Sequence, residues 1–175
     1  MNINNIPTIN TKADFLANAE LMVQESLDQY GQLADSMELH NNLETAAQFR
    51  ELENMEKQQL EWIEQQALGI ALPEIAPWDF VWHCHDDPTK SSLSEMDYLV
   101  NPARALSAAL HNEYHSEEVY REVAKQSSDP VVKELASELA ERQLKQIELL
   151  KWCMETLPKE AYELLEDMDP PNMPE

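Results

Sequence analysis

The scarcity of glycine is the feature that most narrows the fold of this chain. Only Gly31 and Gly69 occur in 175 residues, whereas a sheet protein with several tight hairpins normally needs more, because many hairpin turns require a positive φ. The ten prolines leave three long proline-free stretches, 8–72, 103–129 and 131–157. These stretches are rich in Ala, Leu, Glu, Gln and Lys, which are strong helix formers. The sequence therefore predicts an all-α fold.

Local start and stop signals divide these stretches into helices. Asn41 or Asn42 suits the N-cap of a second helix, and Gly69 follows its last turn. Pro102 and Pro130 each follow an asparagine or aspartate, the usual order of residues at the start of a helix. Apolar residues recur at spacings of three and four throughout. We expect long helices over 12–39, 43–68, 102–127 and 130–157.

Two helices, a long connection and two more helices are the layout of an antiparallel four-helix bundle with one crossover. We expect one domain over 12–157, with an irregular crossover at 69–101 between the second and third helices. An arm (1–11) precedes the domain, and a short helix (159–167) and a tail follow it within 158–175. The two halves are similar, because EKQQLEWI (56–63) aligns with QLKQIELL (143–150). This similarity indicates a duplicated helical hairpin.

The charge of the chain excludes several classes of partner. Asp and Glu total 34 against 12 Lys and Arg, a formal charge of −22. Nucleic acids and anionic membranes both require a basic surface, so we expect neither as a partner. No apolar run approaches the ~18 residues of a membrane span, and MNINNIPTINTKADF lacks the features of a secretory signal. We therefore expect a cytoplasmic protein.

Two segments carry a family resemblance. ALHNEYHSEEVYREVAK (109–125) and FRELENMEKQQLEWI (49–63) resemble the third and second helices of rubrerythrin-type proteins in the ferritin-like superfamily. The resemblance covers about residues 12–157 and implies a ferritin-like bundle of the non-haem di-iron lineage. Bundles of this superfamily usually associate, so we expect a dimer. In that family two metal ions are held by a glutamate from each of two helices and a Glu-x-x-His pair from each of the other two.

The sequence contains only part of this family ligand set. Glu56 and Glu113 match family ligands, but Val23 stands where the first helix should supply a glutamate. An amide oxygen is a weak ligand for iron and does not replace imidazole, and amides stand at the three remaining positions, Gln59, Gln143 and Gln146. We therefore expect iron or manganese to be sub-stoichiometric or absent. The leading hypothesis is a degenerate centre in a homodimeric protein that binds a protein partner.

An alignment shifted by one helical turn gives an alternative. Glu20, Glu53 and Glu117 would then join Glu56 and Glu113 as carboxylate ligands. The chain would in that case be a di-iron or di-manganese oxidoreductase that handles peroxide or iron. The competing interpretation is that these glutamates lie on solvated helix faces, as most do in a chain this acidic.

The crossover gives a second alternative. WHCHDD (82–87) brings His83 and His85 together with Cys84 and two aspartates, all good metal ligands. His111 and His115, four residues apart in the third helix, would add a further face. The chain would then be a metal-binding protein that uses this loop. The competing interpretation is that the aromatic residues Trp78, Phe80 and Trp82 pack the crossover against the bundle.

Overall fold

The computed structural model of the chain describes residues 6–83, 101–159 and 161. Over these residues the secondary structure is helical, with no strand. The helices are α1 (Lys12–Leu39), α2 (Leu43–Gln66), α4 (Pro102–Gln126) and α5 (Pro130–Thr156). The predicted all-α four-helix bundle is confirmed. Most of the predicted short helix at 159–167 lies outside the residues that the structure describes.

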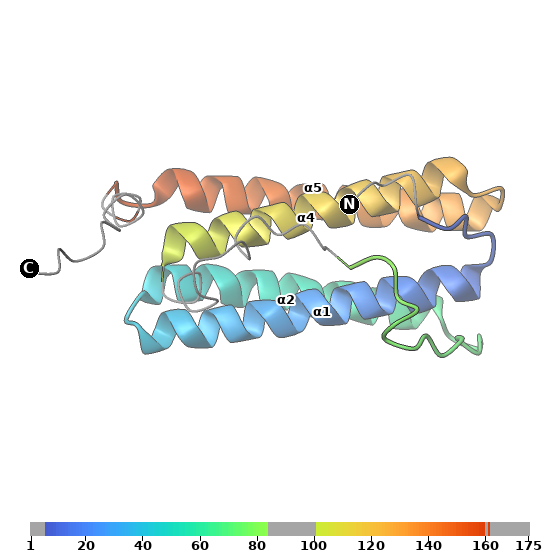
Figure 1. Cartoon of the computed structure of the whole chain (residues 1–175), viewed down its shortest axis with the longest axis horizontal. Coiled ribbons are helices and arrows are strands. Elements are labelled where there is room, and N and C mark those ends of the chain that lie inside the picture. The colour runs from blue at the N-terminus through green and yellow to red at the C-terminus, as the bar shows by residue number, and fades with distance from the viewer. Residues whose placement is uncertain (1–5, 84–100, 160, 162–175) are drawn as a thin grey trace, which may run out of the picture.

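The bundle consists of two antiparallel hairpins that lie side by side (Figure 1). α1 packs mainly against α2, and α4 mainly against α5. α2 and α4 run in the same direction, so α2 ends at one end of the bundle and α4 begins at the other. A connection between two parallel neighbours has to travel the length of the bundle, which explains why the chain needs a long crossover.

The helices begin at residues whose side chains cap them. Asn101 accepts a hydrogen bond from the Arg104 amide at 3.1 Å, and Asp129 accepts one from the Val131 amide at 2.7 Å. Asn42 stands at the N-cap of α2 but makes no side-chain capping bond. α2 ends at Gln66 with Ala67 as its C-cap, so Gly69, with a φ of 77°, lies in the turn beyond rather than directly after the cap. The expected end of this helix at residue 68 was therefore two residues too late.

The apolar core forms two clusters along the bundle axis. One lies around Phe15, Leu16 and Ile63, and includes Tyr120 and Leu139. The other contains the following buried residues: Tyr30, Leu33, Phe49, Leu52, Leu106, Leu150 and Cys153. Along each of α2, α4 and α5, buried polar residues separate the segment of one cluster from that of the other. The bundle therefore has a polar layer between two apolar halves.

The described start of the crossover is held on the bundle by Trp82, which is 1% exposed. Its ring lies 6.1 Å from that of Phe15 and 6.0 Å from that of Tyr120, measured between centroids. His115 Nε2 lies 2.8 Å from the Trp82 carbonyl oxygen. Phe80 is also buried, as predicted, but Trp78 is 85% exposed and does not pack against the bundle. Of the three aromatic residues that we expected to pack the crossover against the bundle, Phe80 and Trp82 do so and Trp78 does not.

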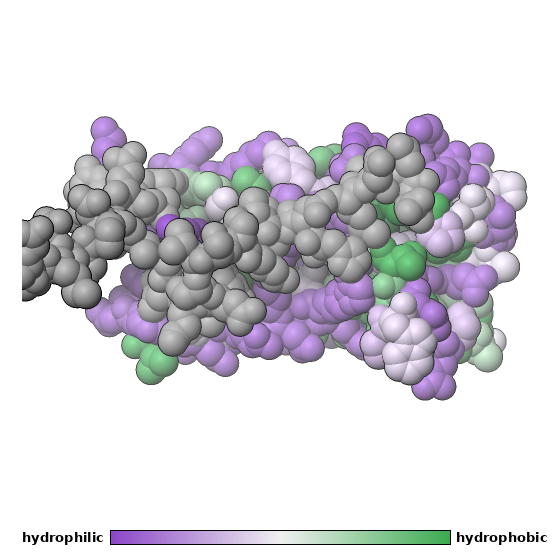
Figure 2. All heavy atoms as spheres, viewed as in Figure 1, coloured by the Kyte–Doolittle hydropathy of each residue, from purple (hydrophilic) through white to green (hydrophobic). Residues whose placement is uncertain are grey.

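The outer surface is mainly hydrophilic, in keeping with the 26% of charged residues in the sequence. Figure 2 shows hydrophilic side chains over most of the described part of the face that it displays. None of the helices in the described part of the chain is both long enough and apolar enough to span a bilayer.

Candidate functional site

The candidate site is the polar layer, which we define as Glu56, Gln59, Glu113, Gln143 and Gln146. Glu56 and Gln59 lie three residues apart on α2, Gln143 and Gln146 three apart on α5, and Glu113 lies on α4. A spacing of three places each pair on one face of its helix. All five are almost completely buried, between 1% and 2% exposed. The helical hairpins therefore point carboxyl and amide groups into the interior of the bundle.

Each carboxyl group receives a hydrogen bond through one of its oxygens. The Tyr30 hydroxyl, from α1, donates to Glu113 Oε1. The side-chain amide of Gln59 donates to Glu56 Oε2 at 3.5 Å. The bond from Tyr30 to Glu113 joins α1 to α4, and no spacing pattern in the sequence indicates it.

Burial is the dominant electrostatic influence on the two carboxyl groups. It raises the pKa of Glu113 to about 8, although the hydrogen bond from Tyr30 acts in the opposite direction. It also raises the pKa of Glu56 well above its ordinary value. The charge of Glu113 raises the Glu56 pKa further, and a hydrogen bond from Gln146 lowers it. The two groups therefore lie close enough to influence each other, and burial favours their protonated forms.

The polar layer contains oxygen atoms that no described group satisfies. Glu56 Oε1, Glu113 Oε2, Gln143 Oε1 and Gln146 Oε1 are buried and have no hydrogen-bond partner among the described residues, and the same holds for the Tyr120 hydroxyl. Leaving a buried acceptor without a donor costs about 1–3 kcal/mol. Native structures rarely tolerate several such atoms together, because buried polar groups are normally paired with protein or with ordered water.

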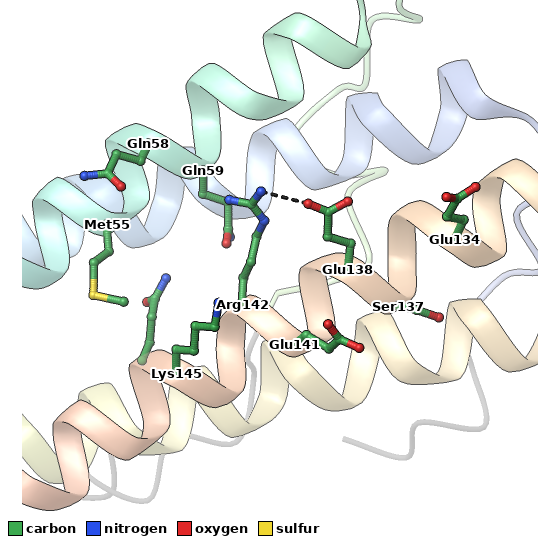
Figure 3. A pocket seen from close by; sticks show the side chains of 10 residues that line it. Met55, Gln58, Gln59, Glu134, Ser137, Glu138, Glu141, Arg142 and Lys145 are labelled. Carbon is green, nitrogen blue, oxygen red and sulfur yellow. Dashed lines mark hydrogen bonds and ion pairs between the residues drawn. The ribbon is translucent and has the colours of Figure 1, made fainter.

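A groove between α2 and α5 leads to this layer. Its volume is about 640 Å³ and its lining includes Gln59 and Gln146. Figure 3 shows Arg142 of α5 reaching across it beside Gln59 of α2. Arg142 donates a hydrogen bond to Glu138 at 2.8 Å and lies 4.7 Å from the ring centroid of Trp62. Sequence reasoning missed this groove, because its shape depends on how two helices distant in sequence are spaced.

The donor chemistry of the polar layer does not fit a di-iron or di-manganese centre. Val23 is buried in the apolar cluster and supplies no ligand atom. Where the resemblance implies two histidines and a further carboxylate, the chain has Gln59, Gln146 and Gln143. Two carboxylates offset only half of the charge of two divalent ions, and without imidazole the layer has no nitrogen ligand suited to iron.

Comparison with known proteins places the chain in a family. No family model matches the sequence, and no curated protein matches it. The fold matches the solved structure of an uncharacterised conserved protein, COG1633, from Magnetospirillum magnetotacticum MS-1. The two chains are 33% identical, with a TM-score of 0.72, and the match covers 85% of this chain and 96% of the other. The chain belongs to the COG1633 family.

The carboxylates proposed as shifted ligands in this COG1633 bundle have other partners. Glu53 pairs with Arg50 at 3.0 Å and with Lys57 at 2.8 Å. Glu117 lies 3.5 Å from Arg121, and Glu20 accepts a hydrogen bond from Gln24. Within the described ranges, no group of three or more His, Cys, Asp or Glu side chains is arranged to hold a metal ion. The structure does not bring Glu20, Glu53 and Glu117 together with Glu56 and Glu113 in such a group.

The histidines of the crossover hypothesis are also engaged in other contacts. His83 Nδ1 lies 2.9 Å from a carboxylate oxygen of Glu25, and His115 contacts the Trp82 carbonyl. Burial lowers the pKa of His115, which favours its neutral form. His85 and the rest of the predicted loop site lie outside the described residues. In the described part of the crossover, His83 contacts Glu25 of α1 and the Trp82 carbonyl contacts His115 of α4, and both contacts hold the segment on the bundle.

Proposed function

We propose that this chain is a rubrerythrin-related protein that has lost the di-metal redox chemistry of its lineage and acts by binding. The observation that supports this most strongly is the donor set of the polar layer, in which two carboxylates remain and three amides replace the other ligands. Glutamine keeps the size of a glutamate and remains polar in place of a histidine, so the layer remains polar while its capacity for iron is reduced.

The surroundings of the two carboxyl groups support the same interpretation. The Tyr30 hydroxyl engages one oxygen of Glu113, and the Gln59 amide engages one oxygen of Glu56. Redox chemistry at a di-metal centre needs carboxylates that are ionised and free to bridge two ions. In this bundle neighbouring side chains occupy one oxygen of each carboxyl group.

The experiment is to restore the missing ligands. The variant Val23→Glu/Gln59→His/Gln143→Glu/Gln146→His rebuilds the family set around Glu56 and Glu113. We expect inductively coupled plasma mass spectrometry to find about two iron ions per chain in this variant and less than one in the wild type. Both proteins should be produced untagged in medium supplemented with iron and manganese, and circular dichroism should show that both are folded.

Two results would contradict the proposal. The first is a pair of iron or manganese ions in the wild-type chain that is lost in Glu113→Ala. The second is a folded variant that binds no more iron than the wild type, since the four replaced positions would then not explain the difference. As a further control, adding Glu113→Ala to the restored variant should abolish its iron binding.

A further inference from the structure

We propose that the groove between α2 and α5 binds a short peptide with both ends free. The peptide carboxylate would lie against Arg142 and Lys145, and the peptide ammonium against Glu138. This inference rests on the proposed function, because it names a ligand for a chain that acts by binding. It concerns charged side chains of the outer groove and assigns no ligand to the buried carboxyl groups of the polar layer.

The two hairpins meet along two seams, and the structure closes these seams to different extents. On the seam between α1 and α4, the Asn112 amide donates a hydrogen bond to Gln29 at 2.7 Å, and Tyr30 donates one to Glu113. Trp82 of the crossover packs on rings from both of these helices. On the seam between α2 and α5 the side chains leave the groove of about 640 Å³. Sites for small molecules usually measure about 300–1,000 Å³, so this seam has room for a ligand.

The α5 wall of the groove is divided into an acidic part and a basic part. Glu134, Glu138 and Glu141 line the part nearer the start of α5, and Arg142 and Lys145 follow toward its end. Figure 3 shows Glu134 at one end of this row and Lys145 at the other. The α2 residues that line the groove are uncharged: Met55, Gln58 and Gln59. A ligand of one charge sign is repelled by one of the two parts, so the wall favours a ligand that carries both signs.

The basic part offers donors suited to a carboxylate. A terminal nitrogen of Arg142 donates to Glu138 at 2.8 Å, and the guanidinium lies 4.7 Å from the ring centroid of Trp62. The Nε atom of Arg142 has no acceptor among the described residues. Lys145 lies three residues further on, which places it on the same face of α5. A guanidinium and an ammonium on one face form charge-assisted hydrogen bonds with a carboxylate.

The distance between the two parts indicates the length of the ligand. Glu138 and Lys145 are seven residues apart on α5, which corresponds to about 10 Å along the helix axis. An extended peptide of about three residues has the same span. A single amino acid carries its ammonium and carboxylate on one carbon and cannot reach both parts. Glu134 and Glu141 add to the negative potential around the ammonium.

The test is a heteronuclear NMR titration of the isotope-labelled full chain with the peptide Ala-Ala-Ala at low salt. We expect saturable shifts confined to the groove, including the indole of Trp62 and the side-chain amide of Gln58, with a dissociation constant of about 1 mM or lower. The affinity should fall as NaCl is added, because salt screens exposed charges. Shifts that do not saturate, or that spread over the whole surface, would overturn the inference.

Three further ligands test whether both charged ends are recognised. N-acetyl-Ala-Ala-Ala lacks the ammonium, Ala-Ala-Ala amide lacks the carboxylate, and free alanine keeps both charges but is too short. We expect each to bind about fivefold more weakly than Ala-Ala-Ala, or worse, since each loses at least one charged contact. If the acetylated peptide binds as tightly as the free one, the groove recognises only a carboxylate and the inference is wrong.

The decisive variant is Arg142→Gln/Lys145→Gln, which removes the basic part of the wall and should weaken Ala-Ala-Ala binding about fivefold or more. Lys145→Gln alone changes an exposed residue and should weaken binding in the same direction without affecting the contact between Arg142 and Trp62. The matched control is Arg121→Gln/Lys125→Gln, which removes the same charge from exposed positions of α4. Equal losses in the decisive variant and in this control would overturn the inference.

The outcomes separate this inference from the proposed function. If Ala-Ala-Ala does not bind and the wild type contains no pair of metal ions, the peptide site is wrong and the proposed function stands. If the wild type contains two iron or manganese ions that depend on Glu113, the proposed function is wrong and the inference built on it falls with it.

Discussion

The Tyr30 hydroxyl donates a hydrogen bond to Glu113 and thereby joins the N-terminal hairpin to the C-terminal one at the polar layer. Tyr120 occupies the matching place in the internal repeat, at an offset of 90 residues. Both tyrosines are completely buried, but the hydroxyl of Tyr120 has no partner among the described residues. The two halves of the bundle thus bury the same side chain to the same extent, and among the described residues only Tyr30 has a hydrogen-bond partner for its hydroxyl.

This asymmetry predicts different effects for one chemical change. Tyr30→Phe should lower the free energy of unfolding by about 1–3 kcal/mol, because it leaves a buried carboxyl group without its donor. Tyr120→Phe should be neutral or slightly stabilising, because it removes a buried hydroxyl that has no partner. Urea denaturation followed by circular dichroism measures both. Equal losses in the two variants would show that the Tyr30–Glu113 bond contributes nothing specific.

The helix caps give a second paired comparison. Asp129 accepts hydrogen bonds from two amides at the start of α5, whereas Asn42 makes no capping bond at the start of α2. Asp129→Ala should cost about 1 kcal/mol, and Asn42→Ala should cost less. The same urea experiment compares them. A larger loss for Asn42→Ala would mean that the cap geometry does not determine the stability of these helix starts.

Features that depend on neighbouring residues were predictable from the sequence. The caps at Asn101 and Asp129 and the helix-forming composition between the prolines are local signals, and the fold class follows from them. The polar layer was also found, because the repeat and the family resemblance placed Glu56 and Glu113 among three glutamines. Burial of all five residues is consistent with that assignment.

Features that depend on contacts between distant residues were not predictable. The bond from Tyr30 to Glu113 spans 83 positions, and no spacing rule indicates which of two equivalent tyrosines makes it. The groove between α2 and α5 depends on the distance between helices from different hairpins. The exposure of Trp78, next to the buried Phe80 and Trp82, depends on how an irregular segment turns, and periodicity does not describe such segments.

The attachment of the crossover gives a third prediction. His115→Ala removes the contact to the Trp82 carbonyl and should increase amide hydrogen exchange over residues 80–83. We expect it to lower the free energy of unfolding by about 1 kcal/mol. His111→Ala, four residues earlier on the same helix, is the control and should leave exchange in this segment unchanged. Equal exchange in both variants would show that Trp82 is held by its ring contacts alone.

The buried carboxyl groups predict how stability depends on pH. The pKa of Glu113 in the folded chain is about 8, above its ordinary value of 4.5. The unfolded chain therefore releases this proton at a lower pH than the folded chain does. The stabilisation from the protonated group is complete below pH 4.5 and is lost as pH rises through about 8. In EDTA, where no cation competes with protons, the free energy of unfolding should fall over this range by up to about 1.4 kcal/mol per pH unit.

Glu113→Gln tests the origin of this dependence, because glutamine resembles the protonated carboxyl group and does not titrate. Urea denaturation between about pH 5 and pH 9 should show a shallower fall in the variant, which should exceed the wild type in stability at the alkaline end. Glu61→Gln, at an exposed position on α2, is the control and should follow the wild type. Glu56 also has a raised pKa, so some dependence should persist in Glu113→Gln and disappear when Glu56→Gln is added. A wild-type curve without a fall in this range would mean that both carboxyl groups are ionised in the folded chain, against the direction that burial imposes.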